Sequence, residues 1–433
     1  MAKKKIQNEL RCIYCGRSEQ EGAQILPSPD MEGGVCIDCL ETAANMLGLV
    51  GEHNEDDTAS RARAKYRSAN PHAAPAPKHE HKKIPTPADI KAFLDQYIIG
   101  QDQAKRYLSV AVYNHYKRLD QPIDDDGVEI EKSNIIMVGP TGTGKTLIAR
   151  TIAKQLDVPF TIVDATVLTQ AGYVGEDIES LLTRLLQAAD YDVKKAERGI
   201  VFIDEIDKIA RKGDNPSITR DVGGEGVQQG LLNLLEGSVV NVPPQGGRKH
   251  PEQPMIAVDT KNILFICGGA FEGIEQAIAS RLNTSFVGFS TESESRKNDR
   301  ANLMRHVAPQ DLRTFGLIPE IIGRLPILTH LLPLDRDALR RILTEPKNAI
   351  TRQYEKLLAM DGVKLTFLPE ALDFIVDKAI EYKLGARGLR SIVETIMMNA
   401  MFEMPGTKPE SFEVTADYCK RQLEAAHFDA QAV

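Results

Sequence analysis

Two groups of residues in this chain combine chemically active side chains with a regular spacing. The first is a pair of Cys-x2-Cys motifs, Cys12 with Cys15 and, after 20 residues, Cys36 with Cys39. The second is the octapeptide Gly139-Pro140-Thr141-Gly142-Thr143-Gly144-Lys145-Thr146, which matches the pattern GxxxxGK[ST]. The cysteine spacing is typical of a metal site, and the octapeptide is typical of a loop that binds phosphate groups.

The cysteine spacing predicts one zinc ion bound by four thiolates. Each Cys-x2-Cys turn aims two thiolates at the same ion, and two turns complete a tetrahedron. Four independent structural or redox cysteines are the alternative, but redox motifs rarely come as two pairs at this separation. Four thiolates leave no position open for a substrate, so the predicted zinc is structural. Because about 50 residues bury too little core to fold alone, the metal would supply folding free energy.

The charge of this segment indicates what the zinc module binds. Residues 1–50 carry five Lys and Arg against seven Asp and Glu. A surface of this sign does not attract nucleic acid. We therefore expect the module to bind protein, either a second copy of itself or a client.

The glycine-rich octapeptide stands in the context that phosphate binding requires. It follows an apolar run at 134–138, which predicts a buried strand, and it precedes a helical run at 147–156. Backbone N–H groups of such a loop cradle the phosphates. Lys145 is expected to reach the β- and γ-phosphates, and Thr146 is expected to hold Mg²⁺. A plain glycine turn is the alternative, but it does not require a strand before it and a helix after it.

A second buried strand, predicted at 200–203, ends in two acids. Asp204 is expected to complete the magnesium shell, and Glu205 is expected to polarise the attacking water. Two surface acids after a strand would be the ordinary interpretation of this pair. The phosphate loop upstream favours the catalytic interpretation. The predicted cofactors are therefore a nucleoside triphosphate, which the family resemblance described below implies is ATP, together with Mg²⁺ and structural Zn²⁺.

The elements that must position these residues follow from the apolar patterns. Short β-branched runs alternate with helical patterns in the middle of the chain, which predicts a three-layer α/β domain with a parallel sheet. These runs lie at 134–138, 160–163, 199–203 and 262–267. After about residue 335 the pattern changes to that of amphipathic helices. Its apolar positions are Leu372, Ile375, Val376, Ala379, Ile380, Leu389, Ile392, Val393, Ile396, Met397, Ala400 and Met401.

We expect four parts along the chain. Residues 1–51 would form the zinc module, with a short apolar helix predicted at 39–49. Residues 52–88 carry almost no large apolar side chain, which predicts a flexible linker. Residues 89–331 would form the large α/β domain, and residues 332–425 the small, mainly helical domain.

The composition excludes several classes of protein. The 433 residues carry a net charge of −8, which argues against a general binder of nucleic acid. No apolar stretch approaches the ~18 residues that a membrane span needs. The basic residues at 3–5 are not followed by an apolar segment, so no signal peptide is predicted. We expect a cytoplasmic location, with neither a membrane nor nucleic acid as a partner.

The combination of motifs resembles a known family. A phosphate loop, a strand that ends in Asp204-Glu205 and a trailing helical domain resemble the AAA+ ATPases. Together with the cysteine module, Gly-Tyr-Val-Gly at 172–175 and Gly-Ala-Arg-Gly at 385–388, the chain resembles the ClpX family, the unfoldase subunits of the ClpXP protease. The resemblance implies a homohexameric ATPase without peptidase activity of its own. It would unfold tagged client proteins, presented directly or by adaptor proteins, and deliver them to the ClpP peptidase.

The resemblance also implies roles for residues around the nucleotide. Arg324 matches the arginine finger that acts on a neighbouring subunit, and Arg387 matches the second sensor. Ile98 and Ile99 resemble the adenine-side segment, although ordinary core residues are an equal alternative. The predicted ATP-binding residues are therefore Ile98 and Ile99, the phosphate loop 139–146, and Leu147, which follows the loop. At the expected first-sensor position, a strand at 263–266 ends in Cys-Gly-Gly, so no first sensor can be named.

Three loops would contact the client or the peptidase. Tyr173 and Val174 match the pore loop, against the alternative of a plain turn. Two further stretches resemble axial loops, 214–224 and the basic run Arg248-Lys249-His250, which would suit an acidic or carboxylate signal. Val287-Gly288-Phe289 matches the aliphatic-Gly-Phe tripeptide through which ClpX family members dock on ClpP.

Two other functions compete with protein unfolding. A zinc-bearing AAA+ motor acting on nucleic acid would need a basic surface studded with aromatic residues, whereas the zinc segment is acidic and the chain has no Trp. A scaffold that does not hydrolyse ATP would not need Lys145, Thr146, Asp204 and Glu205, all of which are present.

Overall fold

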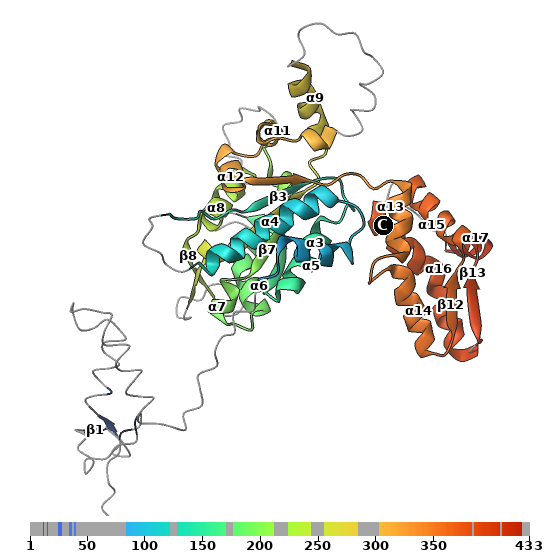
Figure 1. The fold of residues 1–433 in the computed structure, drawn as a ribbon, viewed down its shortest axis with the longest axis horizontal. Coiled ribbons are helices and arrows are strands. Elements are labelled where there is room, and N and C mark those ends of the chain that lie inside the picture. Colours follow the sequence, from blue (N-terminus) through green and yellow to red (C-terminus); the bar gives the residue numbers. More distant parts are fainter. Residues whose placement is uncertain are drawn as a thin grey trace, which may run out of the picture. The chain divides into compact units, whose positions relative to one another are not determined.

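The computed structural model describes residues 12, 15, 25–27, 34–36, 39, 84–121, 128–169, 176–211, 224–243, 255–284, 303–382, 385–407 and 409–426. The chain divides into two compact units, Met1–Lys82 and Lys83–Val433 (Figure 1). The first unit contains an antiparallel pair of short strands, β1 (Ile25–Pro27) and β2 (Gly34–Cys36). The helix predicted at 39–49 lies, apart from Cys39, outside the described residues.

A five-stranded parallel sheet forms the centre of the second unit. Its strand order is β11-β3-β10-β7-β4. The bounds are β3 (Ile135–Val138), β4 (Phe160–Asp164), β7 (Ile200–Asp204), β10 (Leu264–Gly269) and β11 (Ile327–His330). The predicted strands are confirmed within two residues at each end, and β11 was not predicted. Because β3, β7 and β10 are buried on both faces, their sequences are continuously apolar.

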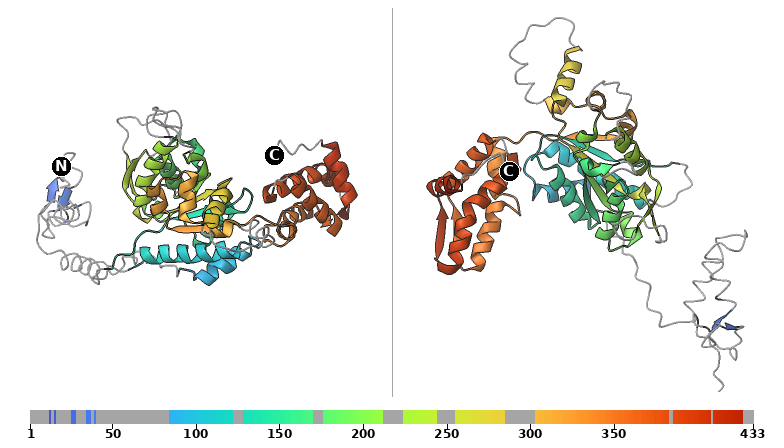
Figure 2. Two further views of the ribbon diagram at one scale, coloured as in Figure 1. Left: turned by 90° about the horizontal axis from the view of Figure 1, so that it is seen from above. Right: turned by 180° about the vertical axis from the view of Figure 1, so that it is seen from behind.

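Alternate residues of these strands enter two different cores, which shows that the domain has three layers. Ile135, Met137 and Phe202 pack into one core with α3 (Pro87–Asp95), α4 (Asp102–Leu119) and α5 (Lys145–Leu156). Ile136 and Val201 pack into the other core, on the opposite face of the sheet. That face is covered by α6 (Ser180–Ala188), α7 (Val193–Ala196), α8 (Glu225–Glu236), α9 (Ile274–Thr284), α11 (Pro309–Phe315) and α12 (Pro319–Arg324) (Figure 2).

Local sequence explains where several of these elements start. Thr86 caps α3 reciprocally with Asp89, and Pro87 occupies the first helical position, where its missing N–H costs nothing. Helix α3 therefore begins inside the last residues of the predicted linker. Shorter strands and 3-10 helices lie between the main helices and strands along the chain. They are β5 (Leu168–Thr169), β6 (Glu176–Asp177), the hairpin of β8 (Val239–Val242) and β9 (Ile256–Asp259), and the 3-10 helices η2 (Ala165–Val167), η3 (Ile206–Ile209), η4 (Thr260–Asn262) and η5 (Leu303–His306).

The C-terminal part has a hydrophobic core of its own and is mainly helical, as predicted. Its elements are α13 (Arg336–Thr344), α14 (Ile350–Met360), β12 (Lys364–Phe367), α15 (Pro369–Glu381), α16 (Gly385–Thr407), β13 (Ser411–Val414) and α17 (Ala416–Ala425). The apolar positions predicted on α15 and α16 enter this core, except that Ile380 is exposed. The parallel pair of β12 and β13 was not predicted. Within the described residues, no helix is both long and apolar enough to cross a membrane.

Candidate functional site

The phosphate loop connects the end of β3 to the start of α5. Gly142 and Gly144 have φ values of 78° and 100°, a left-handed conformation that glycine adopts without steric cost. The Gly139 N–H donates to the Gly269 carbonyl at 3.1 Å, which joins the start of the loop to the end of β10. A β-carbon added at Gly139 would lie 2.7 Å from the Leu331 carbonyl oxygen, so only glycine fits there.

Lys145 is the first residue of α5, and its side chain folds back over the loop. Its Nζ donates to the carbonyl oxygens of Gly139 at 2.6 Å and Pro140 at 3.0 Å. Burial lowers the pKa of Lys145, while the nearby carboxylates of Asp204 and Asp207 act in the opposite direction. An ammonium group held this close to the loop can reach a phosphate that the loop cradles.

Thr146 and Asp204 meet, as the sequence predicted for a magnesium pair. The Thr146 hydroxyl donates to Oδ2 of Asp204 at 2.9 Å, although the two residues are 58 positions apart. Asp204 ends β7, and its partner in the register of β4 is Asp164. One hydroxyl and a carboxylate at a phosphate loop are oxygen ligands of the kind that Mg²⁺ prefers. The residues therefore fit a magnesium ion bound together with a nucleotide.

Glu205 directly follows the sheet and has an unusual backbone conformation. Its φ of 56° is left-handed, a conformation that is strained for a residue with a β-carbon. Its N–H donates to Oδ1 of Asp204 at 3.0 Å. Partial burial and the carboxylates of Asp164 and Asp204 raise the pKa of Glu205. An exposed carboxylate of raised pKa beside the magnesium pair suits a group that polarises water.

The end of β10 carries no side chain that could serve as a first sensor. Cys267 is fully buried between β3 and β7, and burial raises the pKa of its thiol to about 12. A β-carbon at Gly268 would lie 2.7 Å from the Phe202 ring and 3.5 Å from Oδ1 of Asp204. Strand β10 continues through Gly269, which agrees with the expectation that this strand ends in Cys-Gly-Gly.

Sequence reasoning missed Asp207, which is buried near the same strand end. Its Oδ1 accepts from the Ala270 N–H at 3.1 Å and so joins η3 to the residue that follows β10. The sequence feature that could have identified Asp207 is its position, three residues after Asp204. Asp207 holds the strand end in place, and its charge also acts on Lys145 in the phosphate loop.

The adenine-side residues line a cavity. Ile98 and Ile99 are almost fully buried, and they border a cavity of about 450 Å³. The other wall carries Arg341, Glu345 and Lys347 from the C-terminal part. The Lys347 N–H donates to the Gln96 carbonyl at 2.8 Å, which joins the two walls. Ile98 and Ile99 are the two apolar side chains of this cavity, and the other side chains that line it are polar or charged.

Arg387 lies in the first turn of α16, close to the phosphate loop. A β-carbon at Gly142 would lie 3.4 Å from the Ala386 nitrogen and 3.7 Å from the Arg387 nitrogen. The charge of Arg387 also contributes to lowering the pKa of Lys145. The positive end of a helix therefore adds to the cationic character of the loop.

Arg324 is separated from the phosphate loop of its own chain. It precedes β11, whose first residue Ile327 pairs with Ile135 at the start of β3, whereas the loop follows the other end of β3. Because a strand rises ~3.3 Å per residue, Arg324 is on the order of 10 Å or more from that loop. Its side chain pairs instead with Glu236, at 2.9 Å. This geometry suits an arginine that serves a different subunit.

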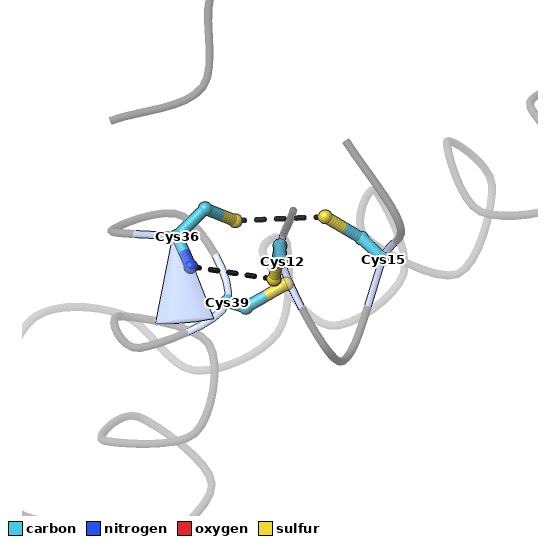
Figure 3. Close-up of side chains that lie close together, drawn as sticks. All are labelled: Cys12, Cys15, Cys36 and Cys39. Carbon is cyan, nitrogen blue, oxygen red and sulfur yellow. Dashed lines mark hydrogen bonds between the residues drawn. The ribbon is translucent and has the colours of Figure 1, made fainter. Parts of the chain in front are cut away.

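The four cysteines form one cluster, as predicted (Figure 3). Their Sγ atoms all lie within 4.8 Å of one another, and those of Cys15 and Cys36 are 3.6 Å apart. Four sulfurs bound to one zinc ion at ~2.3 Å would be about 3.8 Å apart, so the spacing fits zinc. The Cys36 N–H donates to Sγ of Cys12 at 3.3 Å. Burial, with hydrogen bonds from the Cys39 thiol to the other three sulfurs, raises the pKa of Cys39 to about 12, and a cation would reverse this shift.

The predicted client and peptidase loops lie outside the described residues. They are Tyr173 and Val174, residues 214–223 of the axial stretch, Arg248 to His250, and Val287 to Phe289. In the sequence, Tyr173 and Val174 fall between β5 and β6, and the basic run 248–250 falls between β8 and β9.

The fold and the nucleotide site define a P-loop ATPase of the AAA+ class. Residues 130–328 match the AAA domain (Cdc48 subfamily), and residues 334–409 match the C-terminal, D2-small domain, of ClpB protein. A parallel sheet with helices on both faces, a helical C-terminal domain and a cysteine cluster suited to zinc confirm the predicted fold class.

Curated relatives narrow the class to one family. The ATP-dependent Clp protease ATP-binding subunit ClpX of Bacteroides fragilis is 65% identical over 420 residues, which cover 97% of either chain. The subunits of the same name from Porphyromonas gingivalis and Bacteroides thetaiotaomicron are 64% and 65% identical, covering 98% and 96% of either chain. The chain belongs to the ClpX family, and the resemblance seen in its motifs is confirmed.

Proposed function

We propose that this chain uses ATP hydrolysis to unfold tagged client proteins, translocates them through a hexameric ring and delivers them to the ClpP peptidase. Membership of the ClpX family makes it an ATP-binding subunit of the Clp protease type. The observation that carries the proposal is the meeting of Thr146, Asp204 and Glu205 beside the phosphate loop. ATP hydrolysis needs these three groups, whereas a scaffold protein that does not hydrolyse ATP would not need them.

Each residue of the site has a separate task in hydrolysis. The loop N–H groups and Lys145 bind and orient the β- and γ-phosphates, and Thr146 and Asp204 would hold Mg²⁺. The magnesium ion, when bound, neutralises charge on the phosphate oxygens. Glu205 accepts a hydrogen bond from the attacking water and orients it for in-line attack on the γ-phosphate. Ile98 and Ile99 pack on the adenine ring.

Two arginines complete the site from different places. Arg387 reaches the phosphates from the small domain of the same subunit, since the start of α16 lies against the loop. Arg324 stabilises the charge that develops on the γ-phosphate of a neighbouring subunit. The position of Arg324, beyond the far end of β3 in its own chain, is consistent with its action on a neighbour in the proposed homohexamer.

The client is gripped by loops that line the axis of the ring. Tyr173 and Val174, between two glycines, offer a flat ring and a branched aliphatic group that hold any polypeptide by steric contact. The basic run 248–250 attracts an acidic or carboxylate tag at the entrance. The zinc module dimerises and binds clients or adaptors, and the tripeptide 287–289 docks the ring on ClpP. The proteolytic step itself belongs to ClpP.

The experiment that tests this function replaces the gripping side chain. Tyr173→Ala should hydrolyse ATP at a rate close to that of the wild type, because the proposed task of Tyr173 is to grip the client and not to bind phosphate. Unfolding of a stable tagged client should fall steeply, because grip depends on the ring. Tyr173→Phe, which keeps the ring, is the matched control and should unfold the client. Equal loss of ATP hydrolysis and unfolding in Tyr173→Ala would point to a structural tyrosine.

A further inference from the structure

The proposed arginine finger is held by an acid at the end of a neighbouring helix. Arg324 is the last residue of α12, and Glu236 is the last residue of α8. Nε and Nη2 of Arg324 both face Oε1 of Glu236, at 3.0 and 2.9 Å. Glu236 therefore occupies one edge of the guanidinium. Because a guanidinium carries five N–H donors, the Nη1 edge remains available to a second anion.

A buried amide fixes the backbone beside both members of this pair. Nδ2 of Asn134 donates to the carbonyl oxygens of Leu235 at 3.1 Å and Arg324 at 3.0 Å. Asn134 is only 1% exposed, and its Oδ1 accepts from the Phe265 N–H at 3.4 Å. The ends of α8 and α12 are thus joined to the same side chain. Because the backbone is fixed beside both Glu236 and Arg324, forming their ion pair costs less conformational entropy.

The position of Glu236 is unfavourable for the helix that carries it. The C-terminus of a helix carries partial negative charge, so a carboxylate there is destabilising unless a cation neutralises it. Arg324 is that cation. The helix dipole therefore does not account for an acid at this position, whereas a need to orient the guanidinium does.

We propose that Glu236 is a positioning residue for Arg324. It holds the Nε edge of the guanidinium so that the Nη1 edge faces the γ-phosphate bound by the neighbouring subunit. The inference rests on the proposed role of Arg324 as the finger. It assigns to α8 a part in hydrolysis, although this helix does not belong to the phosphate loop or the magnesium pair.

An ordinary surface ion pair is the competing explanation, and kinetics separate the two. The side chains of Arg324 and Glu236 are 54% and 39% exposed, and ion pairs of this exposure contribute little to the stability of a fold. Removing the charge should therefore leave the fold intact. A positioning role predicts a loss in kcat without a change in the KM for ATP, since only transition-state stabilisation is affected.

The test is steady-state ATP hydrolysis by the full-length Glu236→Gln chain. We expect kcat to fall roughly fivefold, with the KM for ATP and the thermal midpoint unchanged. Asp377→Asn is the matched control, because Asp377 also forms an exposed ion pair, with Arg336 at 2.8 Å, and neither residue lines the cavity beside Ile98 and Ile99. Its kcat should equal that of the wild type. An unchanged kcat in Glu236→Gln, or a loss confined to KM, would overturn the inference.

A double variant connects Glu236 to the finger itself. Arg324→Ala alone should lose hydrolysis about a thousandfold or more. In that background, Glu236→Gln should cause no further loss in single-turnover rate, because there is no guanidinium left to position. The same fivefold loss in both backgrounds would contradict the inference while leaving the finger intact. Normal hydrolysis by Arg324→Ala would contradict the finger, and with it the proposed route through the subunit interface.

Discussion

The groups that would contact the phosphates and Mg²⁺ are linked to one another by hydrogen bonds. Lys145 donates to the carbonyls of Gly139 and Pro140, and Thr146 donates to Asp204. Donors and acceptors held in this way need little reorganisation when charge develops on a phosphate, which lowers the barrier to hydrolysis.

The environment of Glu205 predicts a pH dependence. Partial burial and the charges of Asp164 and Asp204 raise the pKa of Glu205. The carboxylate must be ionised to polarise water, so hydrolysis should be lost as the pH falls through this raised pKa. Asp164→Asn removes one of the charges that raise it. The acid limb of the kcat profile should therefore move to lower pH, as measured by ATP turnover across a pH series.

A matched variant isolates the electrostatic effect in this experiment. Asp164 accepts from the Thr166 N–H at 2.8 Å, a bond that asparagine retains. Asp192 caps α7 in the same manner by accepting from the Lys195 N–H, and it is absent from the groups that shift the pKa of Glu205. Asp192→Asn should leave the acid limb where it is. A limb that stays in place or rises in Asp164→Asn would show that another group controls it.

Some residues of the site could be predicted from spacing, and others could not. Lys145, Thr146 and Asp204 belong to motifs whose chemistry requires those types at those positions, and the structure brings them together. Asp207 was not predicted, because its role depends on Ala270 at the end of another strand. The partner of Arg324 was not predicted either, since Glu236 is 88 residues away and no local pattern connects them.

Among the elements, the phosphate loop packs closely against Leu331, the residue that follows β11. A β-carbon at Gly139 would lie 2.7 Å from the Leu331 carbonyl oxygen and 2.9 Å from the Leu331 β-carbon. Neither atom can move without the backbone. Gly139→Ala should therefore lower stability by about 1–3 kcal/mol and weaken ATP binding, because the loop is displaced. Thermal unfolding and ATP titration would measure the two effects.

A second glycine provides the control for this substitution. A β-carbon at Gly406, near the end of α16, would meet nothing within 4 Å. Gly406→Ala should be neutral, or stabilising by up to ~1 kcal/mol through helix propensity. If both alanine variants behave alike, the close packing at Gly139 does not restrict the loop.

Whether a strand could be predicted from the sequence depends on how many of its faces are buried. Strands β3, β7 and β10 are buried on both faces, so they appear as continuous apolar runs and were located within two residues. Strands β12 and β13 alternate between buried and exposed residues over only four positions, which gives too weak a pattern. The strand order depends on pairing between residues such as Ile135 and Ile266, which local patterns do not encode.

For the whole molecule, the division into two units predicts separate responses to metal removal. The unit Met1–Lys82 contains the four-cysteine cluster and β1–β2, whereas Lys83–Val433 has hydrophobic cores of its own. A zinc chelator should abolish the structure of the first unit and leave the melting temperature of the second unchanged. Circular dichroism of residues 1–82 and calorimetry of the full chain would measure this, and added zinc should restore the signal. An unchanged dichroism spectrum after metal removal would refute the zinc assignment.

The assembly of subunits allows two inactive variants to complement each other. Arg324→Ala lacks the finger, and Glu205→Gln lacks the water-polarising carboxylate. If the finger serves a neighbour, a mixed ring contains some sites in which both groups are intact, and hydrolysis should partly return. If finger and site belong to one subunit, no mixture can contain an intact site. The rate of ATP hydrolysis across mixing ratios distinguishes the two.

The central claim is that ATP hydrolysis by this chain is coupled to polypeptide, and one measurement tests it most directly. ATP turnover by the full-length chain is compared in the presence of an unfolded protein and of a polynucleotide, with Glu205→Gln as the variant that binds ATP yet hardly hydrolyses it. We predict that unfolded protein raises turnover, that polynucleotide does not, and that Glu205→Gln responds to neither. Stimulation by polynucleotide alone would contradict the account in favour of a nucleic-acid motor, and the absence of any turnover would leave a scaffold.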